Sequence, residues 1–135
     1  MKKIFLLFFL VVVFTGCATV KDVSRNFAGT STRDLEAGKA DSVYQVYSCS
    51  MADCFAAVTD VADENNYYTF MQDEARGLIV IMNIPGCVDT TEVGIFFTAL
   101  SGQQGTRIEL SSRSSPAKKE VAKVLFSELN DRFKK

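Results

Sequence analysis

Two neighbouring stretches in the C-terminal half of the chain constrain its fold most, because both repeat with a period of two. Residues 92–100 place apolar side chains at every second position, and residues 106–112 alternate apolar with charged or hydroxyl side chains. Successive side chains of a β-strand point to opposite faces of the sheet, so this period indicates strands. Residues 101–105 between them suit a hairpin loop. The two stretches therefore predict a hairpin in an antiparallel sheet that has one buried and one solvated face.

Three further stretches are predicted to be strands. Residues 43–47 are rich in β-branched and aromatic side chains, which pack well on a pleated surface. Residues 67–72 and 78–84 flank a short loop, residues 73–77, that ends in glycine. Together with the first two, these stretches give five strands.

Two helices are predicted from periodicity and from their start signals. Ser50 and Asp53 have the spacing of a capping box, and apolar side chains then recur at helical spacing until Asn65 and Asn66. Ser115 followed by Pro116 is a typical helix start, and an apolar stripe follows it to residue 133. The carboxylates of the first helix lie on its polar side, which predicts a solvated helix face and not a metal site.

The order of elements is β-α-β-β-β-β-α, and the predicted fold class is α+β. The simplest arrangement is a five-stranded antiparallel sheet in which the last four strands form a meander. The first strand is added at an edge beside the fifth, and both helices cover one face. Over residues 43–134 this order resembles the helix-grip or half-TATA-binding-protein arrangement. It is also similar to the periplasmic domains of the C lipoprotein of the outer-membrane β-barrel assembly machinery. The resemblance implies a binding or scaffold role and assigns no site residues.

The N-terminus has the layout of a secretory signal peptide. A short cationic segment, residues 1–3, precedes an unbroken run of eleven apolar residues, 4–14. A helix needs about 20 apolar residues to cross a bilayer, so this run is too short to be a membrane span. A segment of this kind is expected to be removed from the mature chain.

The end of this run resembles the lipobox of bacterial lipoproteins. The residues are Phe14-Thr15-Gly16-Cys17, with Phe14 where the family usually has leucine. The resemblance implies thioether lipidation of Cys17, cleavage before it, and acylation of the freed amine with a fatty acid such as palmitate. Ala18 stands where an aspartate retains many Gram-negative lipoproteins in the inner membrane. The resemblance thus implies an anchor at the periplasmic face of the outer membrane.

The mature chain is predicted to consist of a tether and one domain. Residues 17–41 have no sustained period and are expected to form a flexible tether, in which residues 32–37 have a weak helical pattern. Residues 42–135 are expected to form a single periplasmic domain. Without residues 1–16 the chain carries thirteen Lys and Arg against sixteen Asp and Glu, a net charge of −3. This balance gives no indication of nucleic-acid binding.

The cysteines predict one internal disulfide. With Cys17 committed to lipid, Cys49, Cys54 and Cys87 remain in an oxidising compartment. Cys49 follows the first strand and Cys54 lies in the first turn of the helix, so the two are within reach of each other. The loop that holds Cys87 falls at the opposite end of a sheet whose strands are roughly 17–20 Å long, whereas a disulfide tolerates a Cα separation of about 4.4–6.8 Å. The sequence therefore predicts a Cys49–Cys54 bridge and a free thiol at Cys87.

No motif for catalysis, metal binding or cofactor binding is present in the sequence. The chain has no histidine, which is the commonest general base and metal ligand. The spacing C-x-x-x-x-C differs from the C-x-x-C of thiol oxidoreductases. Phe96 is predicted on the solvated face, beside Met71 or beside Ile79 and Ile81. There it would either form an exposed apolar patch or be covered by the tether or a neighbouring domain.

These observations predict a non-catalytic envelope lipoprotein with no cofactor. We expect it to be held to the membrane through Cys17 and to act as a binding or scaffold module for an envelope protein. The alternative is a carrier of a small hydrophobic ligand or lipid between the helices and the sheet. A large apolar cavity would favour the carrier, and a filled core with exposed apolar side chains would favour the scaffold.

Overall fold

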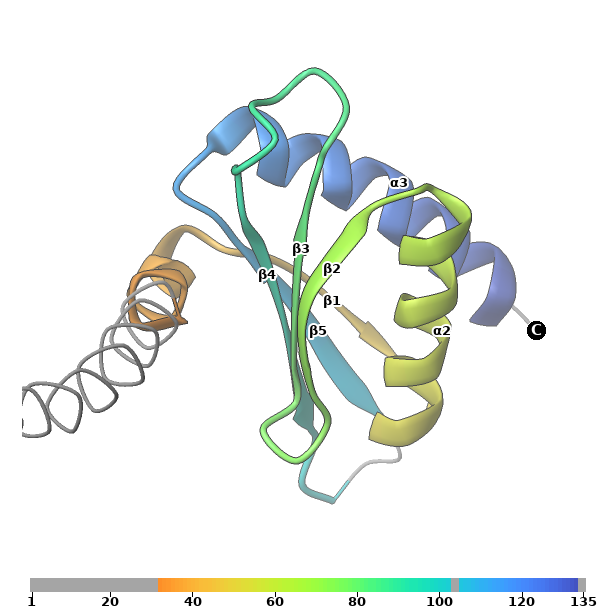
Figure 1. Cartoon of the computed structure of the whole chain (residues 1–135). Helices are drawn as coiled ribbons and strands as arrows, with labels where there is room; N and C mark the ends of the chain where they lie inside the picture. The colour runs from red at the N-terminus through yellow and green to blue at the C-terminus, as the bar shows by residue number, and fades with distance from the viewer. Residues whose placement is uncertain (1–31, 103–104, 134–135) are drawn as a thin grey trace, which may run out of the picture. The chain divides into compact units, whose positions relative to one another are not determined.

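The computed structural model describes residues 32–102 and 105–133. The chain divides into two units, and the fold below is that of the unit Asp34–Lys135. Figure 1 shows its elements in chain order: η1 (Gly38–Asp41), β1 (Val43–Tyr47), α2 (Met51–Glu64), β2 (Tyr68–Asp73), β3 (Leu78–Met82), β4 (Val93–Ala99), β5 (Thr106–Ser111) and α3 (Ser115–Phe133).

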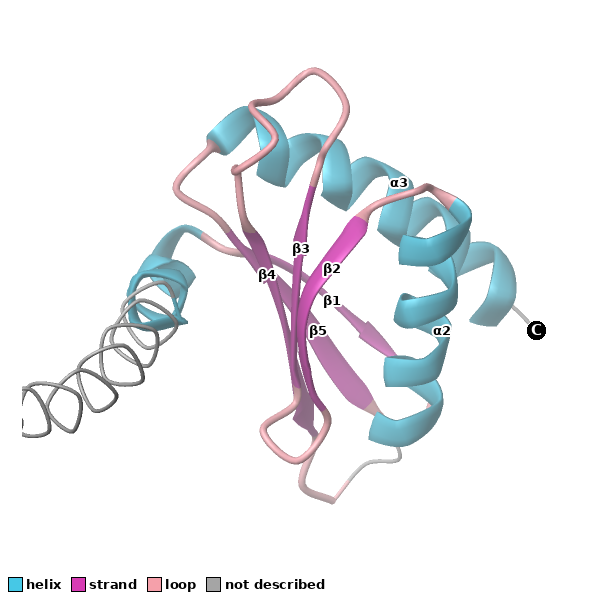
Figure 2. Cartoon of the chain, in the orientation of Figure 1, coloured by secondary structure: helices cyan, strands magenta, loops and turns pink. Residues whose placement is uncertain are grey.

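The five strands form one antiparallel sheet with the order β1-β5-β4-β3-β2. This confirms the predicted α+β class, the meander of the last four strands, and the place of β1 at an edge beside β5. Figure 2 shows α2 and α3 together on one side of the sheet.

The main core lies between this face of the sheet and the two helices. The inward side chains of β3, β4 and β5 are nearly inaccessible to solvent, as are the apolar stripes of α2 and α3. Burying these two amphipathic stripes is what holds the helices on the sheet, because neither stripe can be buried by its own helix. The largest inaccessible side chains of this layer include Val58, Val61, Ile79, Ile81, Ile95, Ile108, Leu110, Leu125 and Leu129.

Helix α2 begins and ends at the predicted signals. The Ser50 Oγ accepts a hydrogen bond from the Asp53 backbone N–H at 3.1 Å, and it donates one to the Asp53 carboxylate at 2.7 Å. At the other end, Asn65 is the C-cap and Asn66 takes a left-handed conformation with φ 57°. Serine is common as an N-cap because its hydroxyl accepts a hydrogen bond from a free backbone N–H, and asparagine is common at helix ends because it tolerates a left-handed conformation.

Helix α3 begins one residue before the predicted start. The helix runs from Ser115, and the Ser114 Oγ accepts a hydrogen bond from the Ala117 N–H at 3.3 Å. Ser114 therefore takes the capping position that the sequence analysis gave to Ser115. Two adjacent serines offer the same hydroxyl, and the loop from β5 decides which of them is used.

Residues 34–41, which we call the strap, differ from the predicted tether. Residues 32–37 are helical, as their weak helical pattern indicated, η1 follows at once, and the strap packs on the sheet face opposite α2 and α3 (Figure 1). The prediction of a flexible tether up to residue 41 is wrong for these eight residues, and the folded unit begins at Asp34. The reason is a tertiary contact: Leu35 is only 3% exposed and packs with Phe96, Leu78 and Val80 in a second apolar cluster.

Polar contacts also hold the strap in place. The Ser111 hydroxyl donates a hydrogen bond of 2.6 Å to the Leu35 carbonyl, and the Lys39 ammonium lies 4.0 Å from the centre of the Phe96 ring. An ion pair joins Glu36 to Arg76 at 3.1 Å. None of these partners is a neighbour in sequence, so no local pattern could have predicted them.

Several predicted features lie outside the described residues. These are the signal peptide (1–16), the lipidation site Cys17 and residues 18–31 of the tether. Within the ranges 32–102 and 105–133, no helix is both long enough and apolar enough to cross a bilayer.

Candidate binding surface

The three cysteines of the domain lie as the sequence analysis predicted. Cys49 is joined to Cys54, with their Cα atoms 5.9 Å apart, and Cys87 is a free thiol in the loop between β3 and β4. Figure 1 shows that loop at the opposite end of the sheet from the start of α2. The domain fold therefore separates Cys87 from the other two.

The bridge closes a rigid corner between β1 and α2. Cys54 is fully buried, and the Thr106 hydroxyl at the start of β5 donates a hydrogen bond of 2.9 Å to the Cys49 carbonyl. Neither cysteine lies in a C-x-x-C motif or beside a lysine or histidine that would stabilise a thiolate. This geometry suits a structural cross-link.

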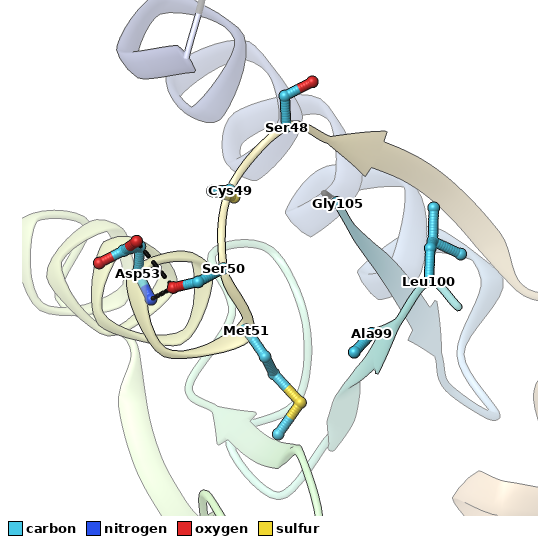
Figure 3. Close-up of a pocket in the computed structure, with 8 residues that line it drawn as sticks. All are labelled: Ser48, Cys49, Ser50, Met51, Asp53, Ala99, Leu100 and Gly105. Atoms are coloured by element: carbon cyan, nitrogen blue, oxygen red, sulfur yellow. Dashed lines mark hydrogen bonds between the residues drawn. The ribbon is translucent and has the colours of Figure 1, made fainter. Parts of the chain in front are cut away.

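A hollow of about 610 Å³ lies beside this corner, at the end of the sheet. Figure 3 shows the residues that line it: Ser48, Cys49, Ser50, Met51, Asp53, Ala99, Leu100 and Gly105. Ser50 and Asp53 bond to each other across the helix start, as the dashed lines mark. A serine whose hydroxyl is held by a carboxylate and a backbone N–H, without an imidazole, is not arranged as an activated nucleophile. The hollow therefore has the chemistry of a helix cap.

The acidic face of α2 is paired within the domain. Arg132 of α3 contacts Asp60 at 3.5 Å and Glu64 at 2.7 Å. In the part of the chain that the structure describes, no group of three or more His, Cys, Asp or Glu side chains could hold a metal ion. Asp60 and Glu64 thus form exposed ion pairs that join α2 to α3.

The apolar patch around Phe96 is covered by the strap. Phe96 is 5% exposed, and Met71 packs against the same cluster. The neighbours Ile79 and Ile81 lie in the main core on the other face. The sequence left open whether Phe96 is exposed or covered. In the structure it is covered by the strap, which belongs to the segment that the sequence predicted as the tether.

The strand β1 instead carries the exposed apolar side chains of one sheet edge. Val43, Tyr44 and Val46 are 41%, 55% and 53% exposed. The register with β5 sets Tyr44 opposite Glu109 and Val46 opposite Arg107, so Tyr44 and Val46 share the face of the sheet that α2 and α3 leave open. We call Tyr44, Val46, Arg107 and Glu109 the β1 edge surface.

The charged residues of this surface are ordered by contacts. The Arg107 guanidinium stacks over the Tyr44 ring with 3.8 Å to its centre and pairs with the Glu109 carboxylate at 3.3 Å. Ser42, directly before β1, donates a hydrogen bond to the same carboxylate. The surface thus presents a tyrosine and an arginine held against each other, and both residue types are enriched at protein interfaces.

The opposite edge, β2, has a different character. Tyr68 and Phe70 are 60% and 44% exposed, but the register with β3 shifts between Thr69 and Met71, which is a β-bulge. A bulge twists an edge strand and disturbs its ladder of hydrogen bonds, and it is a common means of blocking edge pairing. The β1 edge has five consecutive regular pairs with β5 and no such irregularity.

Tyr44, Val46 and Arg107 are not among the functional residues predicted from the sequence. The sequence nevertheless contained the information needed to find them. Its pattern placed β1 at an edge beside β5, and it placed Arg107 on the solvated face of the sheet. Carrying that register across one strand would have placed Tyr44 and Val46 beside Arg107.

Comparisons with protein-family models and with curated proteins find no match to this chain.

Proposed function

We propose that this chain is an envelope lipoprotein, anchored at the periplasmic face of the outer membrane, whose domain is a non-catalytic binding or scaffold module. The observation that supports this most is the β1 edge surface, where apolar side chains are exposed at a regular strand edge with which no second strand of the described residues pairs. Soluble domains seldom leave such an edge open without protection, so an open one suggests a protein partner.

The packing of the domain favours this role over that of a ligand carrier. The side chains between helices and sheet fill that layer, with Val58, Val61 and Ile79 all at 0% exposure. The hollow of about 610 Å³ lies at the end of the sheet and not between the layers. A carrier would need its apolar cavity where these side chains are packed.

The anchor is tested by mass spectrometry of the full-length protein from membranes. We expect a mature chain that begins at Cys17 with a diacylglyceryl thioether and an acylated amine. The Cys17→Ser variant should remain an unprocessed precursor, while Cys87→Ser should be processed normally. An unmodified Cys17, or a mature start elsewhere, would refute the anchor.

The binding role is tested with a photo-crosslinking amino acid in place of Tyr44, in full-length protein in intact envelopes of the cells that make it. We expect a discrete protein adduct after irradiation. The same substitution at Ser127, which is exposed on α3, is the control and should give no adduct. Equal adducts at both positions, or none at Tyr44, would count against a binding role for this surface.

A further inference from the structure

We infer that the partner of the β1 edge surface is a second copy of this chain, with the two β1 strands antiparallel and centred on Gln45. The two five-stranded sheets would then become one continuous sheet across a twofold axis. This inference rests on the proposed binding role of the edge and adds the identity of its occupant.

The sequence of β1 is complementary to itself in this register. The strand reads Val-Tyr-Gln-Val-Tyr, and antiparallel pairing about Gln45 sets Tyr44 of one copy opposite Val46 of the other, twice. Directly opposite aromatic and β-branched side chains form one of the favourable cross-strand pairs. Tyr44 and Val46 are each more than half exposed in the single chain. In the paired sheet, these two side chains of each copy would cover those of the other copy on the same face.

The charges of β5 do not oppose this register. The order of residues across the interface is Arg107 and Val46 of one copy, then Tyr44 and Glu109 of the other, and the twofold axis repeats it in reverse. Arg107 and Glu109 thus lie at opposite ends of such a row, and no like charges lie directly opposite each other across the interface. A shift of one residue would place Tyr44 of one copy and Val46 of the other on opposite faces of the joined sheet, so that they no longer pair.

Features that usually prevent edge pairing are absent from β1. Its residues, 43–47, include no proline, lysine or charged side chain, and its register with β5 is regular. The β2 edge, by contrast, has a bulge and ends at Asp73. An exposed, regular and apolar edge strand pairs readily with another strand. Confinement of two lipid-anchored copies to one membrane would raise their effective concentration for this contact.

The register predicts a specific cross-link in the full-length protein in membranes. Cysteine replaces Gln45 in a Cys87→Ser background. Directly opposite residues of antiparallel strands have Cα atoms about 4.5 or 5.5 Å apart, and a disulfide tolerates a Cα separation of about 4.4–6.8 Å. We expect mild oxidation of this Gln45→Cys variant to give a disulfide-linked dimer on a non-reducing gel. Peptide mapping then verifies that the two chains are joined at position 45.

The matched control is Val43→Cys in the same background. In the proposed register the two copies of residue 43 lie four residues apart along the strands, about 13 Å, which is too far for a disulfide. Residue 43 is more exposed than residue 45, so random collision would favour the control. A dimer from Gln45→Cys alone supports the inference. Equal dimers from both variants, or a dimer from Val43→Cys alone, would overturn the register.

A second measurement separates this inference from the proposed function and needs no cysteine. The mass of the photo-adduct formed at Tyr44 is compared with the mass of the chain. An adduct of twice the chain mass, lost in the Val46→Lys variant, supports self-pairing. An adduct with a different protein overturns self-pairing and leaves the binding role standing, and the lack of any adduct overturns both.

Discussion

At the residue scale, one glycine shows how closely the strap approaches the sheet. A Cβ atom at Gly38 would lie 2.6 Å from the Ser111 Oγ, closer than any normal contact. Ser111 is fully buried, and its hydroxyl is held by the Leu35 carbonyl. The absence of a side chain at position 38 therefore lets Ser111 keep its hydrogen bond to the strap.

Gly38→Ala is expected to lower the free energy of unfolding by about 1–3 kcal/mol, because the new methyl group displaces the buried hydroxyl and leaves a polar group unpaired. Urea denaturation of Gly38→Ala and of the unmodified protein measures this loss of stability. In a Ser111→Ala background the clash partner is gone, so Gly38→Ala should cost clearly less there. Equal costs in both backgrounds would contradict this account.

The disulfide also belongs to the residue scale. Non-reducing peptide mapping should recover Cys49 and Cys54 in one cross-linked peptide, with Cys87 open to alkylation once the protein is unfolded. The bridge closes a loop with a sequence separation of only 5, so its removal should cost about 2 kcal/mol and should leave the protein folded. A peptide that links Cys87 to either partner would contradict the strand order.

At the element scale, the strap and the two helices divide the sheet between them. The helices cover the face that carries Ile79 and Ile95, and the strap covers only the middle of the other face, over Phe96. A Cβ at Gly94 would lie 3.2 Å from Leu35 Cδ1, so this glycine lets Leu35 approach β4. The uncovered remainder of that face includes Tyr44 and Val46 at the β1 edge.

Leu35→Ala is expected to lower the free energy of unfolding by at least about 2 kcal/mol, because it leaves a cavity over Phe96. Glu36→Ala is the matched control, since its ion pair with Arg76 is exposed and should matter by less than about 0.5 kcal/mol. Hydrogen exchange provides a second measurement: the Ser42 amide, which bonds to the Lys39 carbonyl, should be protected in the unmodified protein and exchange faster in Leu35→Ala. Equal costs for the two variants would mean that the strap adds little to stability.

At the scale of the whole molecule, buried tyrosines link stability to alkaline pH. Burial raises the pKa of Tyr47 to about 12, and its hydroxyl donates a hydrogen bond of 2.7 Å to the Gln45 side chain. Burial, with the nearby carboxylates of Glu120 and Glu128, also raises the pKa of Tyr67. Both phenols therefore hold their protons more tightly in the folded chain than in the unfolded chain.

The free energy of unfolding is expected to fall as pH rises from about 10 toward 12. Above pH 10 an unfolded tyrosine loses its proton while folded Tyr47 keeps it, so the unfolded state binds fewer protons and stability declines. Below pH 10 both states are protonated, and these groups cause no change. Urea denaturation at several pH values should show a shallower decline for Tyr47→Phe. The control is Tyr68→Phe, which should match the unmodified protein because residue 68 is 60% exposed. An unchanged slope in Tyr47→Phe would refute the assignment.

The sequence alone determined the class and order of the fold. Strands and helix ends depend on interactions between near neighbours, which a sequence displays directly. Examples are the period of two in residues 92–100 and 106–112 and the helix caps at Ser50 and Asn65. The sheet order followed, because short loops leave few ways to connect five strands. The proximity of Cys49 and Cys54 followed in turn from that order.

The tertiary structure alone decided what covers the open face of the sheet. Leu35 is one apolar residue in a polar stretch without a period, and its place over Phe96 depends on partners more than forty residues away in sequence. The exposure of Tyr44 and Val46 likewise depends on which elements fail to reach the β1 edge. Such contacts arise from the packing of distant segments, and local patterns do not encode them, so the strap and the binding surface appear only in the folded molecule.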